Sequence, residues 1–377
     1  MDKELNLNTV LITTGIYPPD IGGPATFVPR FGQYLVSNGL GVKLITLSNL
    51  VNLKKENNSI QIIRIKRFQI RWVRALKTVF TIARAMRGID YVFSNGLYLE
   101  TALAIRFSSF RGNSLVKIVG DPVWERSQNR SAPPDSLFGK LQSVIYLYFG
   151  KLERKLITWS LIQFDHVTAP GIELAKSVGS WSNKLNVSVV RNGVKITNEN
   201  YKGQKRYDLI VVSRLVSWKN VDVAVSIANK LDCSLAVVGD GPQMADLKLQ
   251  ANSNPRVSFL GSCSNDEINV LLRESKVFCQ FSDYEGLSFS LLQAMSFSLP
   301  CVLSNIEANR DVFKEDSRAA IFVNIQERDE ITSLISDLLN SNIQQLDLGN
   351  RSRRIVEREF NEKDRMNDMQ KLLIKND

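Results

Sequence analysis

Two side chains that could hold hydroxyl groups lie eight residues apart in a stretch that is otherwise mostly apolar. Glu285 lies in a glycine-containing turn, and Gln293 follows on a segment of helical spacing that Leu299 and Pro300 end. A helix start presents free N–H groups and a partial positive charge, which favour phosphate binding. The pattern predicts a pocket for a phosphorylated polyol, with Glu285 and Gln293 on either side of the phosphates. A polar residue on an apolar helix can also be a core group that finds its partner inside the protein.

Two cations, Arg214 and Lys219, lie five residues apart directly after an apolar run with the composition of a strand. A guanidinium can bind two oxygens of a diphosphate at once, and a lysine adds a compact point charge. The spacing therefore suits a pyrophosphate group. Two solvated surface charges would give the same pattern, so the pair indicates a phosphate site only together with the other motifs that follow expected strands.

Glycine-containing turns follow two further apolar runs. Gly22 and Gly23 precede Pro24, a residue favoured in the first turn of a helix, and residues 239–242 read Gly-Asp-Gly-Pro. Glycine adopts backbone angles closed to other residues and lets a ligand approach the main chain. Both turns are candidate phosphate contacts, although such turns also occur in ordinary loops.

The elements that must position these residues alternate along the chain. Short runs rich in Val and Ile alternate with longer amphipathic stretches, which predicts strands joined by helices. The expected strands are 10–14, 42–47, 60–65, 91–94 and 115–119 in the first half and 209–213, 235–238, 257–260, 277–280 and 301–304 in the second. This α/β pattern predicts two doubly wound parallel sheets. Ligands bind beyond the carboxyl ends of such strands, and every candidate motif follows an expected strand.

The charge is divided unevenly between the two halves. Residues 1–200 hold 26 Lys and Arg against 13 Asp and Glu, whereas residues 201–377 hold 22 against 25, so the net charges are +13 and −3. The change follows the turn signal at Asn192-Gly193, and the polar run 195–206 has the composition of a linker. With 377 residues, 44% of them hydrophobic, the chain can form two medium-sized domains.

Several kinds of chemistry have little support in the sequence. The four cysteines lie apart in apolar runs, without the spacing of a zinc site, and are expected to be reduced core residues of a cytosolic protein. The lone histidine, His166, has no neighbouring nucleophile elbow, which argues against a hydrolytic triad. No apolar run is long enough to span a membrane, and no signal peptide is expected.

The segment 64–87 combines eight cations and no acid with interleaved aromatic and aliphatic residues. Such a composition suits an amphipathic element that lies on an anionic membrane surface, where each basic residue contributes about 1 kcal/mol. A core-packed helix with a solvated basic face would read the same way. Nucleic-acid binding is disfavoured, because no nucleic-acid module is recognisable and the other half of the chain is acidic.

The order of these motifs resembles that of the retaining glycosyltransferases of family 4, which have the GT-B fold. The resemblance runs from about residue 10 to about residue 360. The matching motifs are Gly22-Gly23, Asn192-Gly193, the Arg214-x4-Lys219 pair, Gly239-Asp240-Gly241-Pro242, Phe259-Leu260-Gly261 and the Glu285 segment with Ala294-Met295 and Leu299-Pro300. One position departs from the family pattern, since Gln293 stands where the family has a second Glu.

The resemblance implies a role for each of these residues. In the family, the first Glu contacts the donor sugar and the second contacts the nucleotide ribose, which assigns these roles to Glu285 and Gln293. Arg214 and Lys219 would neutralise the leaving diphosphate, and Asp121 would be the polar group near the transferred sugar. With Glu285, these three form the predicted catalytic set. The predicted donor-binding set is Gly22, Gly23, Gly239, Gly241, Leu260, Gly286, Leu287, Ser288 and Gln293.

The resemblance also implies the activity and the domain plan. The expected reaction is transfer of a sugar from a nucleoside-diphosphate sugar, with retention and without a metal ion or other cofactor, to a lipid-linked or polysaccharide acceptor of the cell envelope. The expected domains are residues 1–195 for the acceptor and 206–350 for the donor, facing a central cleft, with 351–377 crossing back to the first. The protein would be cytoplasmic or peripheral on the inner membrane face. A non-catalytic sugar-nucleotide-binding partner of another transferase and a sugar-nucleotide epimerase are the alternatives.

Overall fold

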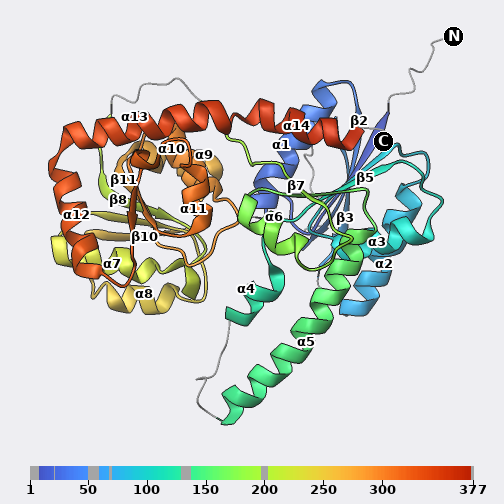
Figure 1. The fold of residues 1–377 in the computed structure, drawn as a ribbon, viewed down its shortest axis with the longest axis horizontal. Helices are drawn as coiled ribbons and strands as arrows, with labels where there is room; N and C mark the ends of the chain where they lie inside the picture. The colour runs from blue at the N-terminus through green and yellow to red at the C-terminus, as the bar shows by residue number, and fades with distance from the viewer. Residues whose placement is uncertain are drawn as a thin grey trace. The chain divides into compact units, whose positions relative to one another are not determined.

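The computed structural model describes residues 8–20, 22–49, 59–67, 70–128, 137–196 and 203–374, without the side chains of 126–128 and 137–149. The chain divides into two compact units (Figure 1). Unit 1 comprises Met1–Val190 and Met366–Asp377, and unit 2 comprises Arg191–Arg365. Among the described residues, no helix combines the length and apolar character needed to cross a bilayer.

Unit 1 is built on a parallel sheet of seven strands in the order β3-β2-β1-β4-β5-β6-β7. The strands are β1 (Thr9–Thr14), β2 (Gly41–Ser48), β3 (Gln61–Lys66), β4 (Tyr91–Asn95), β5 (Asn113–Lys117), β6 (His166–Ala169) and β7 (Val187–Val189). Strands β1 and β4 are almost fully buried on both faces, as expected for the centre of a parallel sheet. The strand order reverses between β1 and β4, which is where open α/β sheets bind ligands.

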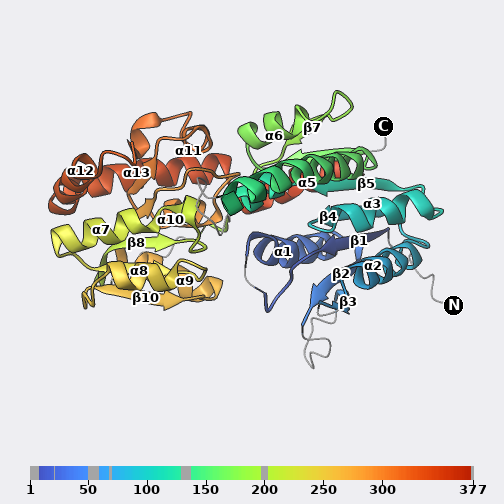
Figure 2. The ribbon, with the colours of Figure 1, turned by 90° about the horizontal axis from the view of Figure 1, so that it is seen from below.

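Helices cover both faces of this sheet. They are α1 (Gly23–Ser37), α2 (Arg71–Ala85), α3 (Tyr98–Phe107), α4 (Pro122–Gln128), α5 (Leu137–Ile162), α6 (Ile172–Gly179) and most of α14 (Glu362–Ile374). The rings of Phe31 and Phe93 meet edge-on at 5.1 Å and join α1 to β4. Helices α2 and α3 pack side by side (Figure 2).

Helix α14 is the last element of unit 1. Its side chains Met366, Met369 and Leu373 are buried. The sulfur of Met369 lies 4.0 Å from the hydroxyl of Thr168 in β6, and the amide of Asn38 donates to Gln370 at 3.2 Å. A helix distant in sequence thus completes the packing of the first unit.

Unit 2 holds a parallel sheet of six strands in the order β10-β9-β8-β11-β12-β13. The strands are β8 (Tyr207–Val212), β9 (Leu235–Val238), β10 (Val257–Gly261), β11 (Ser275–Gln280), β12 (Cys301–Ser304) and β13 (Ile321–Val323). The helices are α7 (Val221–Leu231), α8 (Met244–Gln250), α9 (Asn265–Arg273), α10 (Phe289–Ser296), α11 (Glu307–Val312), α12 (Arg328–Asn340) and α13 (Asn342–Glu359), with short turns η1 (Ser217–Lys219) and η2 (Ser317–Ala319). Alternate residues of β8 enter different cores, since Leu209 packs in one and Ile210 in the other.

The turn after Val190 packs against the junction of α13 and α14. The N–H of Val194 donates to the carbonyl of Phe360 at 2.9 Å, and the N–H of Glu362 donates back to Val194 at 3.1 Å. Phe360 is 1% exposed, and the guanidinium of Arg191 lies 5.2 Å from its ring centroid. Of the predicted linker 195–206, residues 197–202 lie outside the described part of the chain.

The prediction of two α/β parallel-sheet units is confirmed, and a strand forms at each of the ten expected positions. Strands β9 and β12 have the predicted bounds, and the other eight differ by one to two residues at one or both ends. Three further strands, β6, β7 and β13, were not predicted; they are only three or four residues long.

The cysteines were expected to be reduced core residues. Cys233, Cys279 and Cys301 are buried and free, whereas Cys263 is free but only half-buried.

Candidate functional site

The site in unit 2 lies at the carboxyl edge of its sheet, where the strand order reverses between β8 and β11. The loops that follow these two strands are joined to each other. Asn220 has a left-handed backbone, with φ 46°, and its side-chain amide donates to the carbonyl of Phe281 at 2.9 Å and to Asp283 at 2.8 Å. The N–H of Asp283 donates to the carbonyl of Trp218 at 2.8 Å. These bonds hold the two loops in fixed register.

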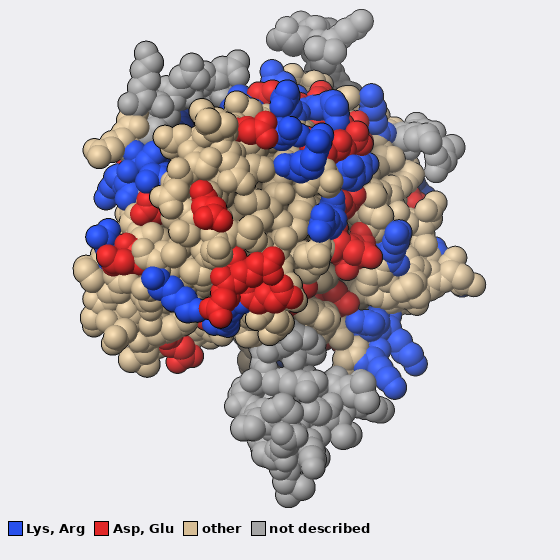
Figure 3. Space-filling model, turned by 60° about the vertical axis from the view of Figure 1, so that its left-hand side comes forward, with Lys and Arg blue, Asp and Glu red and all other residues tan. Residues whose placement is uncertain are grey.

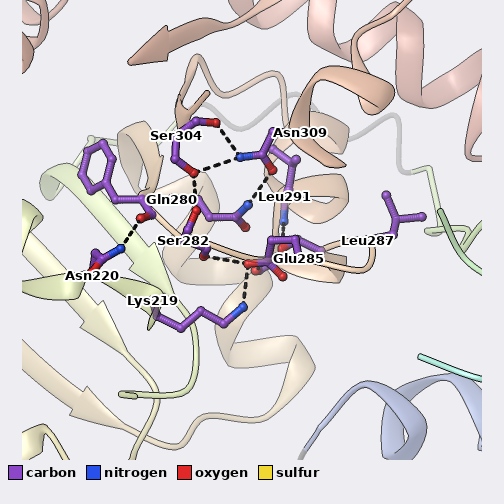
Figure 4. A network of polar contacts seen from close by, with 12 residues as sticks. Lys219, Asn220, Gln280, Ser282, Glu285, Leu287, Leu291, Ser304 and Asn309 are labelled. Carbon is purple, nitrogen blue, oxygen red and sulfur yellow. Dashed lines mark hydrogen bonds and ion pairs between the residues drawn. The ribbon is translucent and has the colours of Figure 1, made fainter. Parts of the chain in front are cut away.

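Lys219 and Glu285 meet across these loops (Figure 4). The Nζ of Lys219 lies 2.6 Å from Oε1 of Glu285, and the hydroxyl of Ser282 donates to the same oxygen at 2.7 Å. The side chains of Lys219 and Glu285 are 14% and 10% exposed. Both of these contacts are made to Oε1, so Oε2 of Glu285 can accept a hydrogen bond from a ligand hydroxyl.

A buried chain of polar side chains, drawn above the pair in Figure 4, supports it. The hydroxyl of Ser304, at the end of β12, donates to the carbonyl of Ser282 at 2.6 Å. The amide of Asn309 in α11 donates to the carbonyl of Ser304 at 2.9 Å and accepts from Gln280 at 3.0 Å. A buried polar network in which each member has a partner is rigid, so Glu285 is held in place.

The Gly239–Gly241 turn packs against the residues that flank Arg214. Gly239 has φ +130°, and a Cβ there would lie 1.8 Å from the carbonyl oxygen of Ser213. A Cβ on Gly241 would lie 2.3 Å from the carbonyl oxygen of Leu215. Only glycine allows this approach. The turn therefore shapes the loop that carries Arg214, whose exposed side chain stacks over Trp218 at 5.7 Å.

The remaining candidates of unit 2 adjoin this edge. The carbonyl of Gly261, next to the half-buried Leu260, accepts from the N–H of Gly239 at 2.7 Å. Gly286 follows Glu285 directly. Leu287 is 9% exposed in the core.

Helix α10 begins at the site, and Gln293 lies on it. The hydroxyl of Ser288 caps the helix by accepting from the N–H of Leu291 at 3.2 Å. Gln293 is 9% exposed, and its amide donates to Asn269 of α9 at 3.3 Å. The structure thus gives Gln293 a partner inside the protein, as in the alternative interpretation of the sequence.

The candidates Gly22, Gly23 and Asp121 belong to unit 1. Gly23 begins α1, and the carbonyl of Gly22 accepts from the N–H of Thr26 at 3.0 Å. One carboxylate oxygen of Asp121 accepts from the N–H groups of Val123 and Trp124, both at 3.0 Å. The other pairs with Arg154 at 2.9 Å. Asp121 therefore caps α4, and both of its oxygens are engaged.

Sequence reasoning missed several groups at this edge. Asn309 reaches Gln280 only because β11 and β12 are adjacent, and Ser282 reaches Glu285 only through the turn of their shared loop, so a single sequence carries no local mark of either contact. Asn220 has a left-handed backbone, a conformation in which asparagine is enriched several-fold. The hydroxyl of Ser213 and the side-chain oxygen of Gln243 are buried without a hydrogen-bond partner among the described residues. Unpaired buried polar atoms at a ligand-binding edge are positions where a ligand or a water can bind.

The arrangement offers charge and hydrogen bonds in place of a nucleophile. Burial raises the pKa of the Cys279 and Cys301 thiols well above its usual range, so these thiols stay protonated and inert. In the described part of the chain, no cluster of His, Cys, Asp and Glu is placed to hold a metal ion. The cations Arg214 and Lys219 can bind phosphates, and the fixed carboxylate of Glu285 can accept hydrogen bonds from hydroxyl groups. The arrangement therefore suits a ligand that has both.

The part of the chain that contains this site matches a known protein family. Residues 195–355 match the model of the glycosyl transferases group 1. The sulfoquinovosyl transferase SQD2 of Arabidopsis thaliana is 27% identical over 180 residues, covering 42% of this chain and 35% of its own length. The UDP-Gal:alpha-D-GlcNAc-diphosphoundecaprenol alpha-1,3-galactosyltransferase of Escherichia coli is 32% identical over 154 residues, covering 35% of this chain and 40% of its own. The chain thus spans between a third and two fifths of these relatives' lengths.

Solved structures are similar in fold to this chain over nearly its whole length. The structure of a S. aureus TarM variant in complex with Fondaparinux, alpha-GlcNAc-glycerol and UDP superposes with a TM-score of 0.76 and 10% identity, covering 98% of this chain and 100% of that one. Identity at this level shows the fold alone. The chain therefore has the GT-B fold of glycosyltransferases, and its residues 195–355, which hold Lys219 and Glu285, match the glycosyl transferases group 1.

Proposed function

We propose that the protein is a retaining glycosyltransferase of family 4 that moves a sugar from a nucleoside-diphosphate sugar to a lipid-linked or polysaccharide glycan. The Lys219–Glu285 pair at 2.6 Å, in the part of the chain that matches the group 1 family, carries this proposal. The bond between C1 of the sugar and the diphosphate breaks, and C1 bonds to an acceptor hydroxyl, whose proton the departing diphosphate accepts.

The proposed roles follow from charge and placement. Arg214 and Lys219 stabilise the negative charge that develops on the leaving diphosphate. The free Oε2 of Glu285 holds hydroxyl groups of the donor sugar and orients its ring. Arg214, Lys219 and the start of α10 supply the positive field around the diphosphate, so transfer proceeds without a metal ion. In unit 1, Asp121 is a proposed polar group near the transferred sugar.

The matched proteins support the classes of donor and acceptor. The name of the Escherichia coli relative gives a UDP-linked sugar as donor and a lipid diphosphate glycan as acceptor. The TarM structure is a complex with Fondaparinux, alpha-GlcNAc-glycerol and UDP. We accordingly propose a cell-envelope glycan as the product, made at the cytoplasmic face of the membrane by a cytoplasmic or peripheral protein.

The contact of Gln293 with Asn269 supports a second candidate, a protein that binds a sugar nucleotide without turning it over. Gln293 replaces the family's ribose-contacting Glu, and its amide already has a partner. Binding of the donor without transfer or hydrolysis would favour this second function.

We also propose that α2 rests on an anionic membrane. Exposed residues of this helix include Trp72 and Phe80, which are 67% and 69% exposed, together with Arg71 and Lys77. On the face shown in Figure 3, by contrast, acidic and basic side chains are interspersed. Apolar rings beside cations that lack acidic neighbours suit the interface of an anionic bilayer.

A thermal-shift screen of nucleoside-diphosphate sugars tests the donor part of the proposal. A ligand that binds the folded state raises the apparent stability in proportion to its affinity. We expect nucleoside-diphosphate sugars that share one nucleotide to raise the unfolding temperature. Transfer assays with the donor that stabilises the protein most then distinguish a transferase from a protein that only binds the donor. If no nucleoside diphosphate or its sugars shifts the transition at millimolar concentration, the proposed donor site is wrong.

A further inference from the structure

Unit 1 contains a pocket of about 510 Å³ between α2 and the residues that end and follow α3. Ligand-binding pockets have volumes of about 300–1,000 Å³. Its floor is part of the core of unit 1, since Met86 and Phe110 are 3% and 8% exposed. The rim is open, since Phe80 and Phe107 are 69% and 76% exposed. The pocket therefore connects the surface to the apolar interior.

An exposed apolar row leads into this pocket. Trp72, Leu76 and Phe80 follow at intervals of four residues on α2, which places them on one face of the helix. They are 67%, 64% and 69% exposed, and Leu76 and Phe80 also line the pocket. Contiguous exposed apolar surface of this kind marks an interaction site rather than ordinary surface.

Two arginines add a preference for anions. Arg84 and Arg87 line the same pocket and are exposed. Neither forms an ion pair with any described residue, and the segment 64–87 contains no acid. Arg64 and Arg67 of that segment are different, because they bind the Gly15–Asp20 loop, with Arg67 paired to Asp20 at 2.6 Å. The cations available to a ligand are therefore those of α2 and its end.

We infer that this pocket binds a single hydrocarbon chain of an anionic membrane lipid, with the lipid phosphate against Arg84 and Arg87. The inference rests on the membrane-facing role of α2 proposed above. Adsorption of α2 needs only surface contacts, whereas the pocket takes one chain out of the bilayer. The charge of the rim selects an anionic head group, and the apolar walls select the chain.

Alkyl phosphates kept below their micelle concentrations test the pocket without a membrane. Isothermal titration of the whole protein with butyl, hexyl and octyl phosphate should show affinity rising about fourfold per methylene, which corresponds to about 0.8 kcal/mol. Inorganic phosphate should bind far more weakly. Equal affinity for inorganic phosphate and octyl phosphate would overturn the inference, because the chain would then contribute nothing.

Variants test the contact with the hydrocarbon chain and the contact with the phosphate head group separately. Ala83→Trp fills the pocket and should weaken octyl phosphate at least tenfold, whereas Leu249→Trp, on exposed α8 in unit 2, should not. The paired change Arg84→Ala with Arg87→Ala should weaken octyl phosphate but leave octyl glucoside unchanged. Should Ala83→Trp fail to fold, Phe107→Ser at the exposed rim gives the same test. Wild-type affinity in a folded pocket variant would contradict the proposed site.

Vesicle sedimentation distinguishes this inference from the proposed membrane docking. Arg71→Glu with Lys77→Glu should release the protein from anionic vesicles yet leave octyl phosphate binding intact, because neither residue lines the pocket. If the wild-type protein binds octyl phosphate but never sediments with vesicles, docking is wrong and the pocket stands. If it sediments but shows no chain-length dependence, docking stands and the pocket is wrong.

Discussion

The Nζ of Lys219 and Oε1 of Glu285 lie 2.6 Å apart, although the two residues are 66 positions apart in the chain. The contact joins the loop after β8 to the loop after β11, at the reversal of strand order. The pair is nearly buried, with side chains 14% and 10% exposed. The pair therefore joins the two loops that carry the proposed ligand site of unit 2.

The first prediction concerns the coupling of this pair. Lys219→Met leaves Glu285 as a mostly buried charge with Ser282 as its remaining partner, so we expect a loss of about 3 kcal/mol in the free energy of unfolding. Adding Glu285→Gln to the same chain should recover most of that loss. Denaturant unfolding of Lys219→Met, Glu285→Gln and the double variant measures the coupling. A loss in the double variant equal to the sum of the losses in Lys219→Met and Glu285→Gln alone would show that the pair is energetically unimportant.

The second prediction separates ligand binding from folding at Arg214. This side chain is exposed, so Arg214→Ala should leave the unfolding free energy within about 0.5 kcal/mol of the wild type. Loss of a cation that stabilises a leaving diphosphate should lower kcat about 100-fold or more. Sugar transfer and calorimetric binding of the nucleoside diphosphate check this result.

Arg256→Ala provides a matched control for Arg214→Ala. Arg256 pairs with Asp232 and is 52% exposed, away from the proposed diphosphate contacts. We expect transfer and nucleotide binding to stay at the wild-type level in this variant. Near-normal turnover in Arg214→Ala and also in Lys219→Ala would refute the proposed phosphate site.

The third prediction concerns the turn that shapes the Arg214 loop. Gly239→Ala places a methyl group 1.8 Å from the carbonyl oxygen of Ser213, so the backbone must move. Gly261→Ala also has a positive φ, of +67°, but meets nothing within 4 Å. We expect Gly261→Ala to cost about 1–2 kcal/mol and Gly239→Ala clearly more, with lost nucleotide binding. Equal unfolding free energies for the two variants would contradict the packing role of Gly239.

The fourth prediction uses the buried Lys117 of unit 1. Its Nζ has no hydrogen-bond partner among the described residues and lies 4.0 Å from the ring centroid of Phe27. Burial lowers the pKa of Lys117 from 10.5 to about 7. Between these values the unfolded chain binds a proton that the folded protein does not, so stability rises with pH over this window. Below about pH 7 the folded protein carries the full cost of the buried charge.

Lys117→Met tests this directly. The variant should be more stable than the wild type, and its advantage should be largest near pH 6 and shrink toward pH 10. Lys176→Met, at an exposed position of α6, should show no such trend. Denaturant unfolding at the two pH values gives the comparison. A constant difference across pH would mean that Lys117 is not desolvated in the folded protein.

The fifth prediction concerns α2 and membranes. Vesicles that contain anionic lipid should bind the protein at low salt and release it at high salt, since surface charge interactions are screened. Trp72→Ser with Phe80→Ser removes two exposed rings, so it should weaken sedimentation without changing the fold. Neutral vesicles provide the control. Absence of sedimentation with anionic vesicles at low salt would count against membrane docking.

The sequence predicted the sheets well because central strands of parallel sheets are apolar on both faces. Strands β9 and β12 are fully buried, and their bounds match the apolar runs. Strand β7 has only three residues, two of them exposed, so it is too short to be recognised as a strand from the sequence. Short outer strands depend on their neighbours for pairing, which a single sequence does not show.

The placement of the candidate residues was predictable where spacing reflects a strand end, and not where it depends on neighbouring strands, whereas their roles stay predictions. Arg214 and Lys219 lie in the loop after β8 and Glu285 lies in the loop after β11, as their order in the sequence predicted. The contact of Ser282 with Glu285 requires the geometry of the loop. The partner of Gln293 could not be predicted either, because Asn269 lies on a different helix. The segment 64–87 was predicted as one element, but β3 ends at Lys66 and α2 begins at Arg71.

Helix α14 has a consequence for biosynthesis. The first unit spans Met1–Val190 but needs Met366–Asp377 to finish its packing, and the ribosome makes all of Arg191–Arg365 in between. At translation rates of about 5–20 residues per second, this interval lasts on the order of ten to thirty seconds. During that time the nascent first unit exposes the apolar surface that Met366, Met369 and Leu373 later cover. Chaperones that hold apolar surfaces should therefore engage the chain before synthesis of the second unit is complete.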